Sequence, residues 1–264
     1  MAFDLERFRE TLQTHRLGRH CQYFPVASST NTTAHELGRQ GAPEGTVVLA
    51  DAQTGGRGQA GKVWISPPER NLYVSLLLRP PLPPTQASLI SLLAGVALVD
   101  TICQEGVQCG LKWPNDVLIH GRKVAGILAE MESYHNVVQF VVVGIGINVN
   151  MTPAELDRDL GPIASTATSL RATLGREVGR EVFLASLLES LEGWYERFCN
   201  QGSAILLEAW EARSLMQGRR IIARTPEVTW EGIAVGINPA GYLMLRRPDG
   251  SFITLTSAEV RFLD

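Results

Sequence analysis

A glycine-rich stretch at residues 53–64 carries the first side chains that could do chemistry. Its four glycines leave the backbone unhindered, so main-chain N–H groups can approach an anion closely. Arg57 and Lys62 add positive charge, and Trp64 offers a flat face for a base ring. A predicted buried strand, residues 46–50, precedes the stretch. This composition favours a loop that binds a nucleotide or an acyl phosphate, and the alternative is a flexible surface hairpin.

Two common phosphate-binding motifs nearly match this stretch, and both are rejected. Residues 56–61 fit the dinucleotide pattern G-x-G-x-x-G, and residues 56–62 fit most of a P-loop. Both motifs need a helix directly after the glycines, so that its N-terminus faces the phosphates. Residues 63–69 contain a Pro-Pro pair and will not begin a helix. We therefore expect the loop to wrap around its anion.

A second polar group is predicted at the end of a strand, residues 110–113. Proline follows this strand and stops it, which leaves Asn115 and Asp116 at its tip beside Lys112. A carboxylate there can hold Mg²⁺ or a ribose hydroxyl, and an amide can orient a phosphate oxygen. An Asn-Asp turn after proline is also common for purely structural reasons. The neighbouring lysine favours the functional interpretation.

Lysine is rare in this chain, since the 24 basic Lys and Arg residues include only Lys62, Lys112 and Lys123. Codon bias toward Arg is one explanation, but each lysine lies beside a Gly-rich or Pro-Asn-Asp stretch, where a compact ammonium group is useful. The five histidines and four cysteines show no metal-ligand spacing, and no nucleophile–base pair is evident. With Arg57 and Asp116, the lysines suit stabilisation of charge on a nucleotide α-phosphate during attack by a carboxylate.

A third candidate is a central strand at residues 141–149, which places Gly144, Gly146 and Asn148 on one face. Glycine weakens a strand unless something must approach its backbone closely. A flat ligand on that face explains both glycines and the amide. For the glycines alone, close packing of a helix is nearly as good an explanation.

The predicted elements bring these groups to one sheet. Hydrophobic spacing predicts helices at residues 5–12 and 85–105, and the second is apolar nearly all round and therefore buried. A cap-rich turn at residues 28–31 opens another helix that runs to Gly38 or Gly41, and its hydroxyls and amide either only cap the helix or also face a ligand. The predicted strands lie at residues 21–26, 46–50, 72–78, 110–113, 116–120, 123–133 and 137–149. Tight turns at residues 121–122 and 135–136 make the last three strands a meander. The sheet is therefore at least partly antiparallel, and the fold class is α+β.

The second half of the chain changes character. Residues 151–179 have the composition of a polar connector with one short helical turn near Ser169, and amphipathic helices follow at residues 180–198 and 203–212. From Gly218 onward, turn residues separate five short β-rich pieces, which predicts a small β-barrel. We therefore expect two domains, residues 1–214 and 215–264.

Bulk properties limit the partners and the compartment. A net charge of −3 gives no general attraction to nucleic acid or to an anionic membrane, so neither is expected as a partner. The most apolar run, residues 87–99, is too short to span a bilayer. The cysteines are isolated and no signal peptide is evident, so a reducing cytoplasm is expected.

Taken together, these motifs resemble those of the biotin–protein ligases. The blocks that carry the resemblance are residues 55–64, 112–117, 123–128 and 144–148, and residues 29–31, 166–170 and the C-terminal barrel agree with it. The resemblance implies a catalytic domain like that of class II synthetases, followed by a barrel like that of Src-homology-3 domains. It also implies that biotin attacks Mg·ATP to give biotinyl-5′-AMP, and that a lysine of a biotin carboxyl carrier domain, in acetyl-CoA carboxylase or a related carboxylase, then takes the biotinyl group.

The resemblance also assigns residues to ligands, position by position. The implied catalytic residues are Arg57, Lys112 and Lys123. The implied biotin-binding residues are Ser29, Thr30, Asn31, Gln53, Arg57, Gly58, Gln59, Lys123, Gly126, Gly144 and Gly146. The implied ATP-binding residues are Arg57, Trp64, Lys112, Asn115, Asp116 and Asn148. Asp116 is also the implied ligand of Mg²⁺.

Three features depart from the family pattern. The family loop usually reads G-R-G-R-x-G, and here its second Arg is Gln59, so a cation that would grip the adenylate is a neutral amide. Lys62 replaces another usual Arg. Only about 20 residues precede the first predicted strand, too few for the DNA-binding helix-turn-helix that some relatives carry, so no repressor activity is expected.

Two other functions compete with biotin ligation. A lipoate–protein ligase or lipoyl transferase would look similar in fold, but the Lys-Trp-Pro-Asn-Asp block at residues 112–116 and the C-terminal barrel favour biotin. A non-catalytic biotin sensor is the second rival, and the intact Lys112, Asp116 and Lys123 argue against it. The sequence leaves the oligomeric state open between a monomer and a homodimer.

Overall fold

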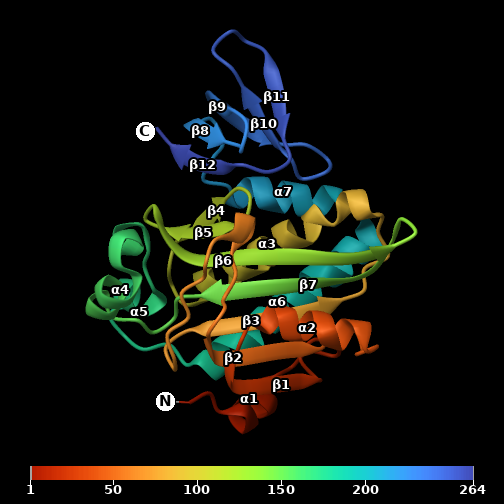
Figure 1. The fold of residues 1–264 in the computed structure, drawn as a ribbon, viewed down its shortest axis with the longest axis vertical. Coiled ribbons are helices and arrows are strands. Elements are labelled where there is room, and N and C mark those ends of the chain that lie inside the picture. Colours follow the sequence, from red (N-terminus) through yellow and green to blue (C-terminus); the bar gives the residue numbers. More distant parts are fainter. Residues whose placement is uncertain (1, 264) are drawn as a thin grey trace.

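The computed structural model describes residues 2–263 and contains two sheets (Figure 1). The larger sheet has seven strands in the order β1-β2-β3-β7-β6-β5-β4. These strands are β1 Cys21–Ala27, β2 Val47–Gln53, β3 Leu72–Leu78, β4 Gly110–Lys112, β5 Asp116–Ile119, β6 Arg122–Tyr134 and β7 Val137–Ile147. β1 and β2 pair in parallel, and the other neighbours are antiparallel. The expected mixed, partly antiparallel sheet of an α+β fold is confirmed.

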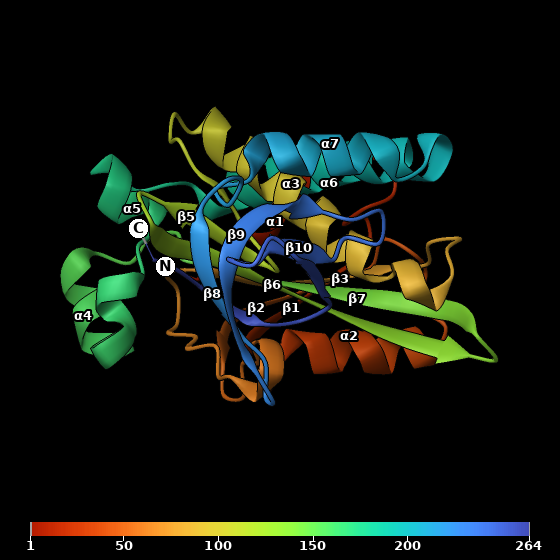
Figure 2. The ribbon, with the colours of Figure 1, turned by 90° about the horizontal axis from the view of Figure 1, so that it is seen from above.

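Helices cover both faces of this sheet (Figures 1 and 2). They are α1 Leu5–Thr11, α2 Thr30–Arg39, α3 Ser88–Gln104, α6 Arg180–Gln201 and α7 Ala204–Arg213. α2 lies on one face, where Ala34 packs in a small cluster with Leu77 and Phe140. α3 and α6 lie on the other face and enclose the main hydrophobic core with the sheet, and α7 packs against α3.

The central helix α3 explains the long apolar run in the sequence. Among the described residues, one helical segment, Pro84–Gln104, is long and apolar enough to cross a membrane by length and composition. In this fold 67% of its most apolar window is buried inside the protein. The helix is therefore a core element, as its nearly uniform apolar surface predicts.

The connector after β7 contains more helix than the sequence predicts. It contains α4 (Pro153–Leu160), a 3₁₀ turn (Gly161–Thr166) and α5 (Leu170–Leu174). The prediction of a polar connector with a single helical turn is wrong for α4. Thr152 and Glu155 form a capping box there, and proline occupies the first turn. This start signal was present in the sequence and outweighs the polar composition.

One hairpin turn also lies one residue earlier than predicted. The turn between β5 and β6 has positive φ at His120 and Gly121, not at residues 121–122. Glycine takes the second central position, as it usually does in a two-residue hairpin turn. The other predicted turn is confirmed, with positive φ at His135 and Asn136.

The smaller sheet is antiparallel, with the order β11-β10-β9-β8-β12. Its strands are β8 Arg220–Arg224, β9 Thr229–Ile237, β10 Leu243–Arg246, β11 Phe252–Leu255 and β12 Glu259–Phe262. These are the five strands expected of the small barrel. Trp113 Nε1 donates to the carbonyl of Gly241 at 3.0 Å, and the N–H of Leu215 donates to the carbonyl of Leu111 at 2.9 Å. These bonds hold the barrel against β4, while the predicted domain boundary after residue 214 stays a prediction.

A buried ion pair joins α6 to β2 beneath the sheet. Arg180 Nη1 lies 2.7 Å from Asp51 Oδ1, and both side chains are buried. The other carboxylate oxygen of Asp51 accepts from the N–H of Phe3 and the hydroxyl of Tyr23. A buried charge is tolerated only when such partners satisfy it. The network therefore fixes α6 and the N-terminal segment to β2.

Replacing Arg180 by Met should strongly destabilise the protein. The substitution leaves the Asp51 carboxylate buried without its cation, which typically costs about 3–5 kcal/mol of the free energy of unfolding. Urea denaturation followed by circular dichroism would measure the change. The control is Arg39→Met, which breaks the exposed pair between Arg39 and Glu132 and should have little effect. Equal losses in the two variants would contradict the prediction.

Candidate functional site

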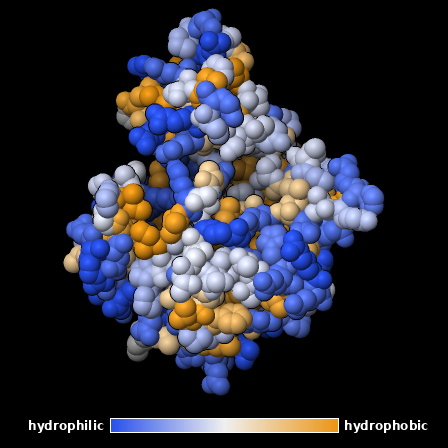
Figure 3. All heavy atoms as spheres, viewed as in Figure 1, coloured by the Kyte–Doolittle hydropathy of each residue, from blue (hydrophilic) through white to orange (hydrophobic). Residues whose placement is uncertain are grey.

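A cavity of about 1020 Å³ opens between the face of the large sheet that carries α2 and the small barrel. Figure 3 shows it as a hollow below the upper lobe. The structure brings every residue assigned to the site to the wall of this cavity. They are Ser29, Thr30, Asn31, Gln53, Arg57, Gly58, Gln59, Trp64, Lys112, Asn115, Asp116, Lys123, Gly126, Gly144, Gly146 and Asn148. Segments far apart in the sequence thus form one site.

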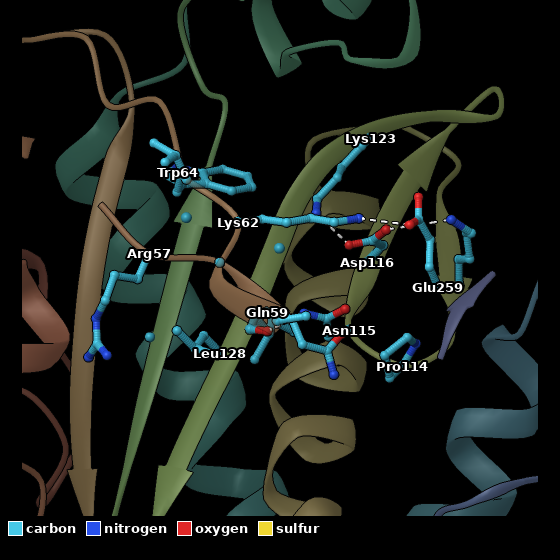
Figure 4. Close-up of a pocket in the computed structure, with 18 of the residues that line it drawn as sticks. Arg57, Gln59, Lys62, Trp64, Pro114, Asn115, Asp116, Lys123, Leu128 and Glu259 are labelled. Carbon is cyan, nitrogen blue, oxygen red and sulfur yellow. Dashed lines mark hydrogen bonds and ion pairs between the residues drawn. The ribbon is translucent and has the colours of Figure 1, made fainter. Parts of the chain in front are cut away.

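The charged end of the cavity is built from three neighbouring strands (Figure 4). Asp116 begins β5 and is flanked by Lys112 at the end of β4 and Lys123 in β6. The carboxylate lies 2.5 Å from Lys123 Nζ and 3.7 Å from Lys112 Nζ. Burial lowers the pKa of the Lys112 ammonium group; Asp116 opposes this shift and Lys123 adds to it. One carboxylate faces two ammonium groups, so this end keeps an excess of positive charge.

Two asparagines at this end support the backbone around it. Asn115 Nδ2 donates to the carbonyl of Ile127 at 2.6 Å, and Asn148 Nδ2 donates to the carbonyl of Thr168 at 3.1 Å. The first bond ties the tip before β5 to β6, and the second ties the end of β7 to the segment before α5. Each amide therefore positions a neighbouring segment, and both asparagines line the cavity.

The opposite end of the cavity is polar but mostly uncharged. Gln53 Oε1 accepts from the N–H of Thr30 at 2.9 Å, and the Ser75 hydroxyl lies 2.8 Å from Thr30 Oγ1 and 2.6 Å from Asn31 Oδ1. Asn31 Nδ2 donates to Glu130 at 2.7 Å. Sequence reasoning missed Ser75 and Glu130. A buried serine within the otherwise apolar strand β3 was the signal that could have found the first.

The beginning of α2 leaves a hydroxyl uncommitted at this end. Ser29 is the N-cap residue of α2, but its side chain makes no capping hydrogen bond. The side chain is nevertheless almost completely buried and lines the cavity. A cap-rich sequence usually serves the helix itself. Here the hydroxyl of Ser29 is available to a ligand, as the functional interpretation of this turn requires.

The strand glycines make room for two different side chains. A Cβ at Gly144 would lie 2.1 Å from Asn31 Oδ1, so this glycine lets the start of α2 pack on β7. A Cβ at Gly146 would lie 2.4 Å from Trp64 Cε2. Packing of a helix residue, the alternative left open for the glycines, therefore accounts for Gly144. A flat ring lies over Gly146, and it belongs to the glycine-rich loop.

Trp64 is the part of the loop that packs on the large sheet. Its ring contacts the backbone at Gly126 and Gly146, and Lys123 Nζ lies 5.2 Å from a ring centroid. Trp64 Nε1 is fully buried and has no hydrogen-bond partner. Buried donors are almost always satisfied. The unpaired N–H therefore marks a position where an acceptor is missing.

Arg57 points away from the other predicted cations (Figure 4). Its guanidinium group lies 2.8 Å from Glu130 Oε2, the same oxygen that accepts from Asn31. The resemblance implied that Arg57 and Lys123 both contact biotin and both act in catalysis. In this structure, Lys123 pairs with Asp116 and Arg57 with Glu130, on different sides of Trp64. Glu130 therefore occupies Nη2 of Arg57 in this structure.

The barrel supplies a wall of the cavity that sequence reasoning did not assign. This wall consists of barrel residues 224–226 and 257–261. The connector adds Leu160, Ile163, Thr166 and Ala167 to the cavity lining. Glu259 of β12 lies 3.3 Å from Lys62 of the loop, and this hydrogen-bonded contact lowers the pKa of the Glu259 carboxyl group. No local sequence motif marks the barrel residues, because only the docking of the barrel brings them to the site.

The carboxylates do not form a preassembled metal centre. Among the described residues, no group of three or more His, Cys, Asp or Glu side chains could hold a metal ion. Asp116 is the single carboxylate among the predicted ligands, and it is already paired with lysine. Magnesium usually takes one or two protein carboxylates together with phosphate oxygens of its substrate. The site therefore fits an ion that arrives with a nucleotide.

Comparison with known proteins agrees with this geometry. The model of the biotin/lipoate A/B protein ligase family matches residues 23–148, and that of the biotin protein ligase C terminal domain matches residues 217–263. The bifunctional ligase/repressor BirA of Bacillus subtilis is 40% identical over 90% of this chain and 73% of the relative. The biotin–[acetyl-CoA-carboxylase] ligase of Paracoccus denitrificans is 38% identical over 89% of this chain and 97% of the relative.

Solved structures give the same result for the fold. The biotin protein ligase from Aquifex aeolicus in complex with biotin and ATP superposes with a TM-score of 0.77 at 25% sequence identity. That likeness covers 92% of this chain and 99% of the Aquifex chain. The two matched family models, the close relatives and the shared fold lead to one conclusion: the chain belongs to the biotin protein ligases of the biotin/lipoate A/B protein ligase family.

Proposed function

We propose that this protein activates biotin with ATP as biotinyl-5′-AMP and transfers the biotinyl group to a lysine of a biotin carboxyl carrier domain. The observation that carries the proposal is a single cavity with two chemically different ends. Lys112, Lys123 and Asp116 make one end cationic, whereas the end at α2 offers neutral amides and hydroxyls. A molecule with an uncharged ring system and an acyl phosphate has the matching distribution of charge.

The neutral end suits the ring system of biotin. Its ureido group carries N–H donors and a carbonyl acceptor, and Ser29, Thr30, Asn31 and Gln53 can offer both kinds of partner. Gly144 of β7 lets Asn31 lie close to the sheet at this end of the cavity. Lipoate has a dithiolane ring without N–H or C=O groups, so it would leave these polar side chains unpaired. Binding sites that hydrogen-bond a ligand reject analogues that lack those groups.

The cationic end supports the first chemical step. A carboxylate oxygen of biotin attacks the α-phosphorus of ATP, and a new O–P bond forms. The bond from the α-phosphorus to the bridging oxygen breaks, and pyrophosphate leaves with the electron pair. Negative charge gathers on the phosphate oxygens during this exchange, where Lys112, Lys123 and Arg57 would stabilise it. Trp64 would contact the adenine, and Asn115 and Asn148 would position the nucleotide.

Magnesium would enter as part of the Mg·ATP substrate. The ion neutralises charge on the phosphates, and Asp116 would be its protein carboxylate. The unpaired Nε1 of Trp64 supports a nearby ligand acceptor. Arg57 would leave Glu130 for the acyl phosphate, since both partners are anionic and compete for the same guanidinium group.

The proposal also covers the carrier protein, the cellular compartment and the oligomeric state. The carrier would belong to acetyl-CoA carboxylase or a related carboxylase, as in the name of the Paracoccus relative. A reducing cytoplasm fits the four free cysteines, and no nucleic-acid partner or repressor activity is part of the proposal. A homodimer stays open alongside a monomer.

Pyrophosphate release separates the proposed activity from its rivals. The purified protein mixed with Mg·ATP and biotin should release pyrophosphate, and it should release far less with lipoate in place of biotin. The opposite preference would identify a lipoate ligase. Biotin binding without pyrophosphate release would identify a sensor and refute the proposal.

Replacing Gln59 by Arg should slow the dissociation of biotinyl-5′-AMP. Gln59 lines the cavity in the turn Gln59–Gly61, and an Arg there would add a charge-assisted hydrogen bond to the phosphate. Such bonds contribute about 1.5–3 kcal/mol, so the rate constant should fall by roughly tenfold or more. Stopped-flow dissociation would measure it. The control is Gln22→Arg, which adds the same charge at an exposed position of β1 and should leave the dissociation rate unchanged. An unchanged dissociation rate in Gln59→Arg would disprove the role given to residue 59.

Replacing Gly144 by Ala should weaken biotin binding. The added methyl group would lie 2.1 Å from Asn31 Oδ1 and must displace that side chain. Overpacking of this kind costs about 1–3 kcal/mol, which corresponds to roughly a tenfold rise in the Kd for biotin. Isothermal titration calorimetry would measure the Kd. Gly193→Ala is the matched control, because a Cβ there meets nothing within 4 Å. The prediction fails if both variants bind biotin equally well.

A further inference from the structure

Glu130 of β6 is the acceptor that holds Arg57 in this structure. Its Oε2 accepts from Arg57 Nη2 at 2.8 Å and from Asn31 Nδ2 at 2.7 Å. Arg57 borders the cavity, but its guanidinium group points away from Lys123 and Asp116 (Figure 4). Glu130 therefore keeps the cation of the glycine-rich loop apart from the charged end of the cavity.

The pair of Arg57 and Glu130 is open to water. The side chain of Arg57 is 46% exposed, and that of Glu130 is 27% exposed. In the buried pair of Arg180 with Asp51, by contrast, each side chain is only 6% exposed. An accessible ion pair contributes little to stability, whereas a buried carboxylate that loses its cation is strongly destabilising. The first pair is therefore suited to an exchange of partners, and the second is not.

Glu130 keeps a hydrogen-bond partner when Arg57 leaves it. Besides its bond to Glu130, Asn31 Nδ2 donates to the carbonyl of Leu128 at 3.2 Å. Asn31 Oδ1 accepts from the Ser75 hydroxyl at 2.6 Å. These bonds fix the amide of Asn31 on the sheet without any contribution from the loop. The carboxylate of Glu130 therefore stays in place as an acceptor to which Arg57 can return.

The backbone of the loop is held independently of the Arg57 side chain. The N–H of Trp64 donates to the carbonyl of Gly56 at 2.9 Å, and Arg57 forms a β-bridge with Val63. These contacts make a small hairpin of the backbone around Arg57. The guanidinium group can therefore change its partner by rotation of its own side chain, while the loop stays where it is.

We propose that Glu130 is a positioning residue that keeps Arg57 from uncharged ligands and releases it to anionic ones, an inference that rests on the proposed function. A ligand with a carboxylate or an acyl phosphate competes with Glu130 and forms a charge-assisted hydrogen bond with the guanidinium group. A ligand with an uncharged tail does not compete, and Arg57 then stays on Glu130. The charge of Glu130 thus lowers the affinity for biotin and biotinyl-5′-AMP, and it leaves the affinity for a neutral biotin derivative unchanged.

Replacing Glu130 by Gln tests this role, because glutamine keeps an acceptor oxygen for Asn31 and removes the charge that holds Arg57. Isothermal titration calorimetry would measure the Kd for biotin and for biotin carboxamide, whose tail is uncharged. We expect the Kd for biotin to fall about threefold, as the loss of an accessible ion pair allows, and the Kd for the carboxamide to stay the same. In an Arg57→Gln background, Glu130→Gln should change neither Kd, since Glu130 acts through Arg57.

Glu132→Gln is the matched control. Glu132 lies two residues further along β6 and pairs with Arg39 at 2.9 Å, outside the cavity lining, so this variant should leave both Kd values unchanged. Thermal unfolding would verify the folding of each variant, and Glu130→Thr would repeat the test with a smaller uncharged side chain. Weaker or unchanged binding of biotin by Glu130→Gln would overturn the inference. An equal change for the two ligands, or the same effect in the Arg57→Gln background, would also overturn it. Absence of biotin binding by the original protein would instead refute the proposed function.

Discussion

The architecture of the site depends on the ion pairs that Asp116 makes with two lysines on the neighbouring strands. A meander with tight turns brings the end of β4, the beginning of β5 and the first part of β6 together. Lys112 and Lys123 then share one carboxylate, so the cluster retains positive charge against an apolar core. Such a cluster is costly to build unless an anion completes it. The loop and the barrel wall are arranged around this unbalanced charge.

The second constraint is close approach to the sheet. Gly126, Gly144 and Gly146 lack the side chains that would separate the strands from their neighbours. Their absence lets the start of α2 and the ring of Trp64 lie directly on the backbone of β6 and β7. The hydrogen-bonded chain from Gln53 through Thr30 and Ser75 then fixes the position of α2. Glycine in a strand is unfavourable by itself. Here the glycines permit the close packing of Asn31 and Trp64 that shapes the cavity.

Much of this architecture follows from local patterns in the sequence. Apolar runs, tight turns and the uniformly apolar α3 predict most of the elements, and the glycine loop and the Lys-Trp-Pro-Asn-Asp block predict part of the cavity lining. The sequence does not predict which cation meets which anion. Arg57 pairs with Glu130 because β6 carries that carboxylate past the loop, a long-range contact without a local signal. The barrel wall was missed for the same reason, whereas α4 was missed although its capping box was present.

The pairing of Lys62 with Glu259 has a consequence for how the site comes into existence. The loop, the meander and the barrel emerge from the ribosome in that order, and the loop gains its partner in β12 only after the barrel has folded and docked. The cavity has its full wall only when the barrel is docked, because residues 224–226 and 257–261 belong to the barrel. Contacts between the loop and the barrel therefore couple the stability of the small sheet to the shape of the site.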